Sequence, residues 1–201
     1  MKRTICFLTL LSIVSYGQTT ANSKENQGGW VTLFDGHSLS GWTPEQGAKW
    51  RVSAGILIGD AGEDGWLCSD RQFTNFLLHI EYRDASKGNS GVFLRATKES
   101  NLSDPSNPAG SYELQINNED EKWATGSIEN FIQRLVAVNP APNQWHSYEI
   151  EVRGDHLIAK LDGTKVLDGR DARFKAGHIG LQHHKNNKIE FRNIRVKPLT
   201  D

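Results

Sequence analysis

The sequence contains little cysteine and no excess of either charge. Its 201 residues include 2 cysteines, Cys6 and Cys68. Because Cys6 lies in the N-terminal apolar segment, removal of that segment would leave Cys68 alone and exclude an intrachain disulfide. Lys and Arg number 23 and Asp and Glu number 24, which gives a formal net charge of -1 at pH 7. The basic excess of nucleic-acid-binding proteins is missing, so we expect no nucleic-acid partner.

Common catalytic and metal-binding motifs are also missing. The chain has no paired-cysteine or His-x-Glu-x-x-His spacing for zinc, no glycine-rich phosphate loop and no serine in a nucleophile elbow. No stretch longer than about ten residues has a clean helical period, so helices should be minor. These absences direct attention to strands and to the polar side chains that strands carry.

The N-terminus has the pattern of a secretory signal over residues 1–17. Lys2 and Arg3 precede an apolar run over 5–14, and Ser15 and Gly17 are small residues of the kind that precede a cleavage site. We therefore expect secretion, into the periplasm. The run is too short to span a bilayer comfortably, so no membrane span should remain after cleavage; an uncleaved anchor is the alternative. The polar residues 18–28 predict a flexible leader before a single domain over 29–201.

Short alternating segments with turn signals between them fill the rest of the chain. In 75–83 and 145–153, apolar and polar residues alternate with the two-residue period of a strand. The pair Asp162-Gly163 is a strong hairpin turn signal. About a dozen such segments predict an all-β fold with two antiparallel sheets packed as a sandwich.

The segment 111–118, SYELQINN, has two unlike faces. Tyr112, Leu114 and Ile116 alternate with Glu113, Gln115 and Asn117. The first set suits a core, and the second is a row of hydrogen-bonding groups with one carboxylate. In a strand expected to be central, this row is typical of a groove for a polar ligand; a solvated outer face is the alternative.

Several segments, taken in order, carry a family resemblance. These are NSGVFLR (89–95), YELQI (112–116), TGSIENF (125–131), W-x-x-Y-E-I (145–150), L-D-G (161–163) and G-x-I-G-L-Q-x-H…F-R-N-I (177–194). Together they resemble the 3-keto-disaccharide hydrolase domain family, over 30–199. Two departures stand out: many members have Tyr soon after T-G-x-I, where this chain has Glu129 and Asn130, and many have Gly after the last His, where it has Lys185.

The resemblance implies a concanavalin-like jelly roll in which sugars lie across one curved sheet. Polar sides of several strands would then converge there. The expected catalytic residues are Glu113, His184 and Arg95. The expected substrate-binding residues are Asn89, Phe93, Gln115, Asn117 and Gln182. Four of these residues could instead have a purely structural role. Asn89 could hold a turn, Arg95 could form an ion pair with Glu113, Phe93 could belong to the core, and His184 could lie on the surface.

The implied substrate is a small carbohydrate, a glycoside already oxidised at C3, so a sugar C3 oxidoreductase should act upstream. The 3-carbonyl acidifies the proton on C2; its removal allows loss of the group on C1, and water then completes a net hydrolysis. Such a site needs a base, Glu113 or His184, and an electrophile at the 3-oxygen, Arg95, His184 or a divalent cation. Glu113, Gln115 and His184 would be the ligands of such a metal ion.

Two other functions remain in view. A non-catalytic carbohydrate-binding module could use the same face of the same fold. A conventional jelly-roll glycan hydrolase usually shows a second carboxylate on the strand, but Gln115 and Asn117 follow Glu113 here. The segment therefore argues against the conventional hydrolase.

Overall fold

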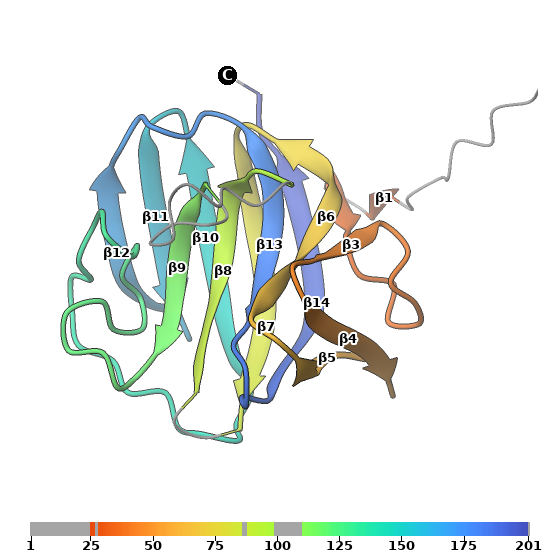
Figure 1. Cartoon of the computed structure of the whole chain (residues 1–201). Helices are drawn as coiled ribbons and strands as arrows, with labels where there is room; N and C mark the ends of the chain where they lie inside the picture. Colours follow the sequence, from red (N-terminus) through yellow and green to blue (C-terminus); the bar gives the residue numbers. More distant parts are fainter. Residues whose placement is uncertain (1–24, 27, 86–87, 99–109, 201) are drawn as a thin grey trace, which may run out of the picture.

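The protein is an all-β sandwich of two antiparallel sheets, as predicted (Figure 1). The computed structural model describes residues 25–26, 28–85, 88–98 and 110–200, and no helix occurs among them. The predicted signal segment, 1–17, lies outside the described residues, as does most of the predicted leader. Glu25 and Asn26, at the end of that leader, form a short strand against Trp30 and Val31.

The larger sheet contains nine strands, and its main path runs β1-β2-β14-β7-β10-β11-β12 with β5 and β4 beside β14. Its strands are β1 (Glu25–Asn26), β2 (Trp30–Thr32), β4 (Ala48–Ser53), β5 (Ile56–Gly62), β7 (Phe76–Asp84), β10 (His146–Arg153), β11 (His156–Leu161), β12 (Thr164–Arg170) and β14 (Ile189–Pro198). We call this sheet A.

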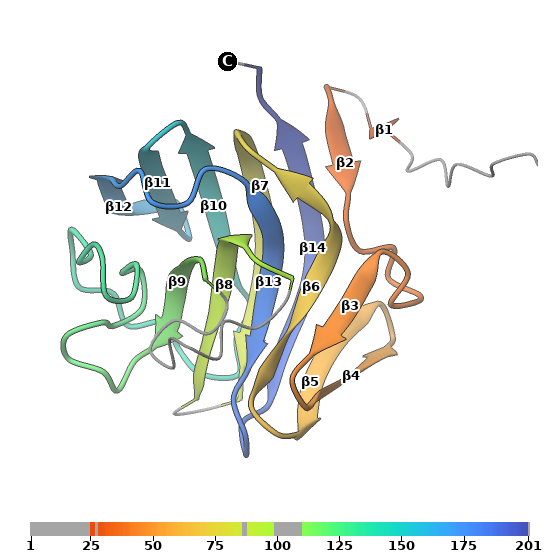
Figure 2. The same ribbon diagram turned by 45° about the horizontal axis from the view of Figure 1, so that its top comes forward.

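The smaller sheet, sheet B, contains five strands in the order β3-β6-β13-β8-β9. They are β3 (Trp42–Glu45), β6 (Gly65–Phe73), β8 (Asn89–Ala96), β9 (Tyr112–Asn117) and β13 (Gly177–His183). Figure 2 shows β9, β8, β13, β6 and β3 side by side in front of sheet A. Neighbours in this sheet come from distant parts of the chain, so long-range pairing decides which side chains meet on its surface.

Alternation in the sequence explains which side of each strand is buried. In β7, Phe76, Leu78, Ile80 and Tyr82 are buried and the residues between them are partly exposed. The Asp162-Gly163 pair joins β11 to β12, and both residues have positive φ, +47° and +81°. Such values suit an Asp-Gly hairpin turn, because glycine adopts them without strain.

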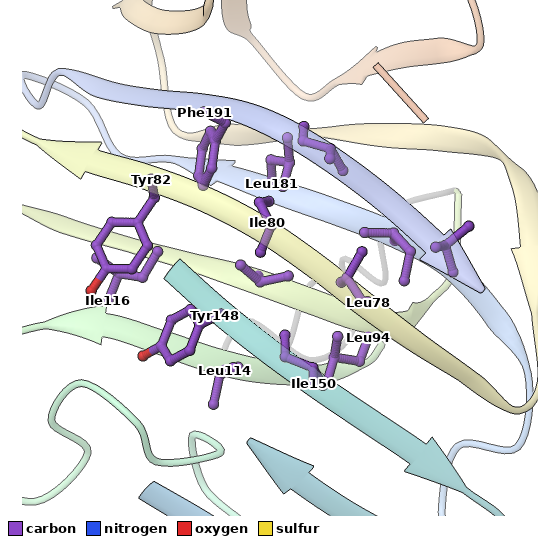
Figure 3. Close-up of a cluster of buried hydrophobic side chains, with 14 of the residues drawn as sticks. Leu78, Ile80, Tyr82, Leu94, Leu114, Ile116, Tyr148, Ile150, Leu181 and Phe191 are labelled. Carbon is purple, nitrogen blue, oxygen red and sulfur yellow. The ribbon is translucent and has the colours of Figure 1, made fainter. Parts of the chain in front are cut away.

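The core lies between the two sheets (Figure 3). Leu78, Ile80 and Tyr82 of sheet A face Leu114 and Ile116 of sheet B in one buried cluster. A large apolar side chain buried in this way stabilises the fold by roughly 1.5–3 kcal/mol. The core therefore occupies one side of sheet B and leaves the side chains of its other side pointing away from sheet A.

One local expectation is wrong. β9 is the last strand of sheet B and not a central one, because β8 pairs with it on one side only. The other edge of β9 is covered by residues 125–129, which form single bridges and turns but no named strand.

No helix in the described part of the chain is long and apolar enough to cross a membrane.

Candidate functional site

The candidate site is the outer face of sheet B, the face turned away from sheet A. Strand register builds one row across it, because Glu113 pairs with Phe93, and Gly180 pairs with both Phe93 and Cys68. The core residues between them, such as Leu114, point to the opposite side. The two-residue period of a strand therefore places these four side-chain positions on one surface.

A second row runs parallel to the first. Gln115 pairs with Gly91, and Gln182 pairs with Trp66. The two parts of the row adjoin, because the Ser90 hydroxyl donates to the Gln182 carbonyl oxygen at 2.8 Å. The structure thus brings together Glu113, Gln115 and Gln182, which the sequence had assigned to one face.

Gly91 makes room for the carboxyl group of Glu113. A Cβ atom at position 91 would collide with Oε1, Cγ and Cδ of Glu113. The Glu113 side chain therefore lies over Gly91, between Gln115 on one side and the Gln182 strand on the other. Only glycine at this position allows so close an approach.

Glu113 is held in an environment that disfavours its charge. Part of the residue reaches solvent, but Oε1 is buried and accepts no hydrogen bond from the residues that the structure describes. Burial raises the pKa of the Glu113 carboxyl group well above its ordinary value, and the neighbouring Glu129 carboxyl group raises it further by repulsion and by hydrogen bonding. A carboxyl group tuned in this way can hold and transfer a proton at pH values at which an ordinary carboxyl group is ionised.

Several buried polar atoms around Glu113 have no hydrogen-bond partner among the described residues. Gln115 is 2% exposed, yet nothing in that part of the chain donates to its Oε1, and the same is true of the buried side-chain oxygens of Gln182 and Asn89. Because buried polar groups in folded proteins are nearly always satisfied, such a cluster indicates a place for a hydrogen-bonding ligand.

The aromatic residues of this face pack against each other. Phe93 and Trp66 are each 2% exposed and meet edge to face with 5.7 Å between ring centroids. Together with Cys68 and Ala96 they form a small apolar cluster apart from the main core. Burial raises the pKa of the Cys68 thiol to about 12, so Cys68 is an apolar filler rather than a nucleophile.

The two predicted asparagines differ in their surroundings. Asn89 pairs with Asn117 across β8 and β9, and its carbonyl oxygen accepts from Asn187 at 3.1 Å. Asn117 Oδ1 accepts from the backbone N–H groups of Glu119 and Asp120 at 3.0 and 3.2 Å. Asn117 thus shapes the turn after β9, whereas the Asn89 side-chain oxygen stays available.

Arg95 does not join the outer face. Phe93 pairs with Gly180 and Ala96 pairs with His178, so Leu94 and Arg95 together oppose one residue of β13. Arg95 has φ of +59° at this bulge, and a bulge redirects the following side chain. The guanidinium group is 2% exposed overall and donates to the carbonyl oxygens of Thr74, Gly154 and Phe174.

This arrangement gives Arg95 a structural role at one end of the sandwich. The carbonyl oxygens of Thr74 and Gly154 belong to the β6–β7 and β10–β11 connections, and a third acceptor, Phe174, precedes β13. One buried cation thus connects three chain segments. None of these contacts leads to Glu113, which removes Arg95 as the electrophile expected beside it.

His184 lies just beyond the end of β13, and its side chain is 46% exposed. Its Nδ1 is 3.5 Å from an Asp64 carboxylate oxygen, in the turn before β6. No contact found among the described residues joins His184 to Glu113 or Gln115, so the expected metal-ligand trio is not assembled. The described residues also contain no group of three or more His, Cys, Asp or Glu placed to hold a metal ion.

Two hollows lie on the outer face of sheet A. One, of about 310 Å³, is lined by Trp30, His79 and Arg195 among others, and a neighbouring one of about 540 Å³ shares His79 and Arg195. Burial lowers the pKa of His79. Neither hollow contains a buried polar atom that lacks a partner among the described residues, so neither matches the outer face of sheet B as a built site.

The chain matches the family model described as a 3-keto-alpha-glucoside-1,2-lyase-like domain over residues 29–197. The protein belongs to this family. A relative in Bacteroides thetaiotaomicron named 3-keto-disaccharide hydrolase is 26% identical over 230 residues, which cover 85% of this chain and 79% of that protein. Family and relative together support a glycoside hydrolase-like function.

Solved structures of other proteins show the same fold. A protein from Parabacteroides distasonis, described as a candidate glycosyl hydrolase, superposes with a TM-score of 0.75 at 19% identity, covering 86% of this chain and 94% of that one. The carbohydrate-binding module CBM66 from Bacillus subtilis superposes with a TM-score of 0.60 at 18% identity, covering 77% and 94% of the two chains. These likenesses establish a jelly-roll fold for the family member.

Two residues of the site escaped assignment from the sequence. Glu129 was visible only as a departure from the usual tyrosine, and Trp66 only as part of an apolar run. Their proximity to Glu113 and Gln182 depends on pairings between segments far apart in the chain. The glutamate at position 129, where many family members have tyrosine, was the one feature of the sequence that could have pointed to Glu129 as a site residue.

Proposed function

We propose that this family member cleaves glycosides that carry a ketone at C3, by removing the proton on C2, eliminating the group on C1 and adding water. The observation that carries the proposal is the Glu113 carboxyl group, whose pKa is raised by burial and by Glu129 and which is surrounded by unpartnered buried acceptors. A 3-keto-sugar presents hydroxyl donors to such acceptors and an acidified C2 proton to a carboxyl group.

The side chains around Glu113 suit recognition of a sugar. Gln115 and Gln182 flank the carboxyl group with acceptor oxygens. Asn89 adds an acceptor at the end of the row. These groups would replace the water around the sugar hydroxyls, which fixes the orientation of the ring relative to Glu113.

A direct assay tests the proposal. Purified protein is incubated with a disaccharide oxidised at C3 and, in parallel, with its unoxidised parent. We expect release of 3-keto-glucose or its enone from the first substrate alone. Tight binding of the oxidised disaccharide without turnover would overturn the enzyme assignment and support a carbohydrate-binding module, the function to which the fold is also suited. A parallel reaction with chelator measures the contribution of a divalent cation.

We also propose that the protein acts outside the cytoplasm and downstream of an oxidoreductase that introduces the C3 ketone. The charged and apolar pattern over 1–17 supports export. N-terminal sequencing of the protein isolated from the periplasmic fraction should begin at Gln18. Recovery of an intact N-terminus only from the cytoplasm would contradict export.

A further inference from the structure

A second carboxyl group reaches the site from outside sheet B. The segment 125–129 runs along the open edge of β9, where the backbone N–H of Gln115 donates to Ser127 and that of Glu129 donates to Glu113, both at 3.0 Å. In Figure 1 the segment after β9 lies beside this edge of the sheet. These backbone bonds place the side chain of Glu129 next to that of Glu113.

The two carboxyl groups are in contact and are held by a third residue. Glu129 forms a hydrogen bond with the Glu113 side chain, and the side-chain amide of Gln115 donates to Glu129 Oε2. Two carboxyl groups can share a hydrogen bond only when one of them carries a proton. Burial and repulsion both favour the neutral form of Glu113, so we place the shared proton on Glu113.

The side chains around this pair leave buried hydrogen-bond acceptors that a ligand could use. Gln115 is 2% exposed; its side-chain amide donates to Glu129, while its Oε1 has no partner in the described part of the chain. Glu113 Oε1 is also buried without a hydrogen bond from any described residue. A purely structural pair of carboxyl groups would have no need for unused buried acceptors beside it.

We propose that Glu113 and Glu129 form the acid–base pair of the reaction, with Glu129 as the base at C2 and Glu113 as the hydrogen-bond donor to the 3-oxygen. This inference rests on the proposed function and deepens it. The sequence alone argued against a second carboxylate on this face, because it looked for one on the same strand.

The proton and electron balance is complete with these two groups. The Glu129 carboxylate takes the proton from C2, and the C–H electron pair enters the enolate, whose oxygen is stabilised by the Glu113 carboxyl hydrogen. The enolate pair then forms the C1–C2 double bond as the C1–O bond breaks, and the leaving oxygen takes the proton back from Glu129. Addition of water across C1 and C2 gives the hydrolysis product and restores both carboxyl groups.

Exchange at C2 isolates the first step. The substrate is 3-keto-1,5-anhydroglucitol, which has no exocyclic leaving group on C1, and its C2 proton is followed by NMR in D₂O against a protein-free control. We expect Glu129→Gln to slow exchange by at least about a hundredfold. Glu113→Ala should cause a similar loss, whereas Glu113→Gln should remain within about tenfold of wild type because its amide still donates a hydrogen bond. Glu121→Gln, an exposed glutamate of the same loop, is the matched control and should leave exchange unchanged.

Infrared spectroscopy tests the shared proton without reference to activity. The carboxylic-acid stretch assigned to Glu113, from the difference between wild type and Glu113→Ala, should be present at neutral pH. In Glu129→Gln this band should disappear at lower pH, since the repulsion from Glu129 is gone. Loss of the band in the wild type at neutral pH, or an unchanged titration in Glu129→Gln, would overturn the shared proton.

The outcomes separate this inference from the proposed function. Wild-type turnover of the oxidised disaccharide with full C2 exchange in Glu129→Gln would overturn the role of Glu129 and leave the function standing. A wild type that neither turns over the disaccharide nor exchanges C2 would overturn both the function and the catalytic role. In that case the infrared titration still decides whether the two carboxyl groups share a proton.

Discussion

The carboxyl group of Glu113 lies directly over Gly91, in space that any Cβ atom at position 91 would occupy. Gly91 pairs with Gln115 on β9, so the glycine, the amide and the carboxyl group form one local unit. The absence of a side chain at position 91 is therefore as much a part of the candidate site as the carboxyl group itself.

Gly91→Ala should displace the Glu113 side chain and lower turnover of the oxidised disaccharide by about a hundredfold, because catalysis depends on placement of the reacting groups within about 1 Å. Steady-state kinetics with the folded variant, verified by circular dichroism, measure the loss. Gly47→Ala is the matched control, since the atoms nearest to its added Cβ would be those of Glu63, the closest being Cβ of that side chain at 3.0 Å. Equal activity of the two alanine variants would contradict the positioning role of Gly91.

Glu113→Gln should change how stability depends on pH. In the unfolded chain Glu113 releases its proton near pH 4.5, whereas burial and Glu129 raise its pKa well above 4.5 in the folded protein. Between the two values the folded state binds the extra proton, so raising the pH lowers the free energy of unfolding. The Glu113→Gln variant has no carboxyl group to titrate at this position, so its free energy of unfolding does not fall with pH for this reason.

Urea unfolding at a series of pH values measures the effect. The free energy of unfolding of Glu113→Gln, relative to wild type, should increase as the pH rises above 4.5 and level off above the folded-state pKa. A difference that stays constant across this range would show that Glu113 titrates alike in both states.

Arg95→Met should reduce stability and leave the chemistry unchanged. The substitution leaves the carbonyl oxygens of Thr74, Gly154 and Phe174 without their shared donor in a buried position. We expect a loss of about 3–5 kcal/mol in the free energy of unfolding. Turnover per folded molecule should match wild type.

Arg153→Met is the control for Arg95→Met, because the Arg153 side chain is 51% exposed. The free energy of unfolding of Arg153→Met should therefore stay within about 0.5 kcal/mol of the wild-type value. A large fall in turnover by folded Arg95→Met, measured well below its melting temperature, would show that Arg95 does contribute to catalysis or substrate binding.

His184→Ala should lower turnover by less than about tenfold, because the ring is exposed beside Asp64 and does not contact Glu113. Glu113→Ala, assayed in parallel, should lower it by at least about a hundredfold. A comparable loss in His184→Ala would mean that His184 moves into contact with the substrate.

The residues 111–118 show what local patterning could predict. Their two-residue period placed Tyr112, Leu114 and Ile116 in the core and Glu113 and Gln115 on the outer face, as the structure has them. Alternation is a property of the extended backbone itself, so it holds wherever the strand lies in its sheet. The fold class followed in the same way from many such segments and their turns.

The position of β9 at the edge of sheet B, and the covering of that edge by 125–129, could not be predicted in this way. Strand order depends on pairings between segments far apart in the chain. The same holds for Arg95, which alternation placed beside Glu113 and which a bulge against β13 turns into the end of the sandwich.

The sequence by itself thus determined that this protein is a sandwich of alternating strands with Glu113 on a polar face, because side-chain alternation is local. Only the tertiary structure decided which groups surround Glu113. It removed Arg95, left His184 in contact with Asp64, and brought Glu129 from a loop onto the carboxyl group. The physical reason is that contacts between distant parts of the chain set the bulges, the edge pairing and the loop packing. The local period of a strand contains no information about those contacts.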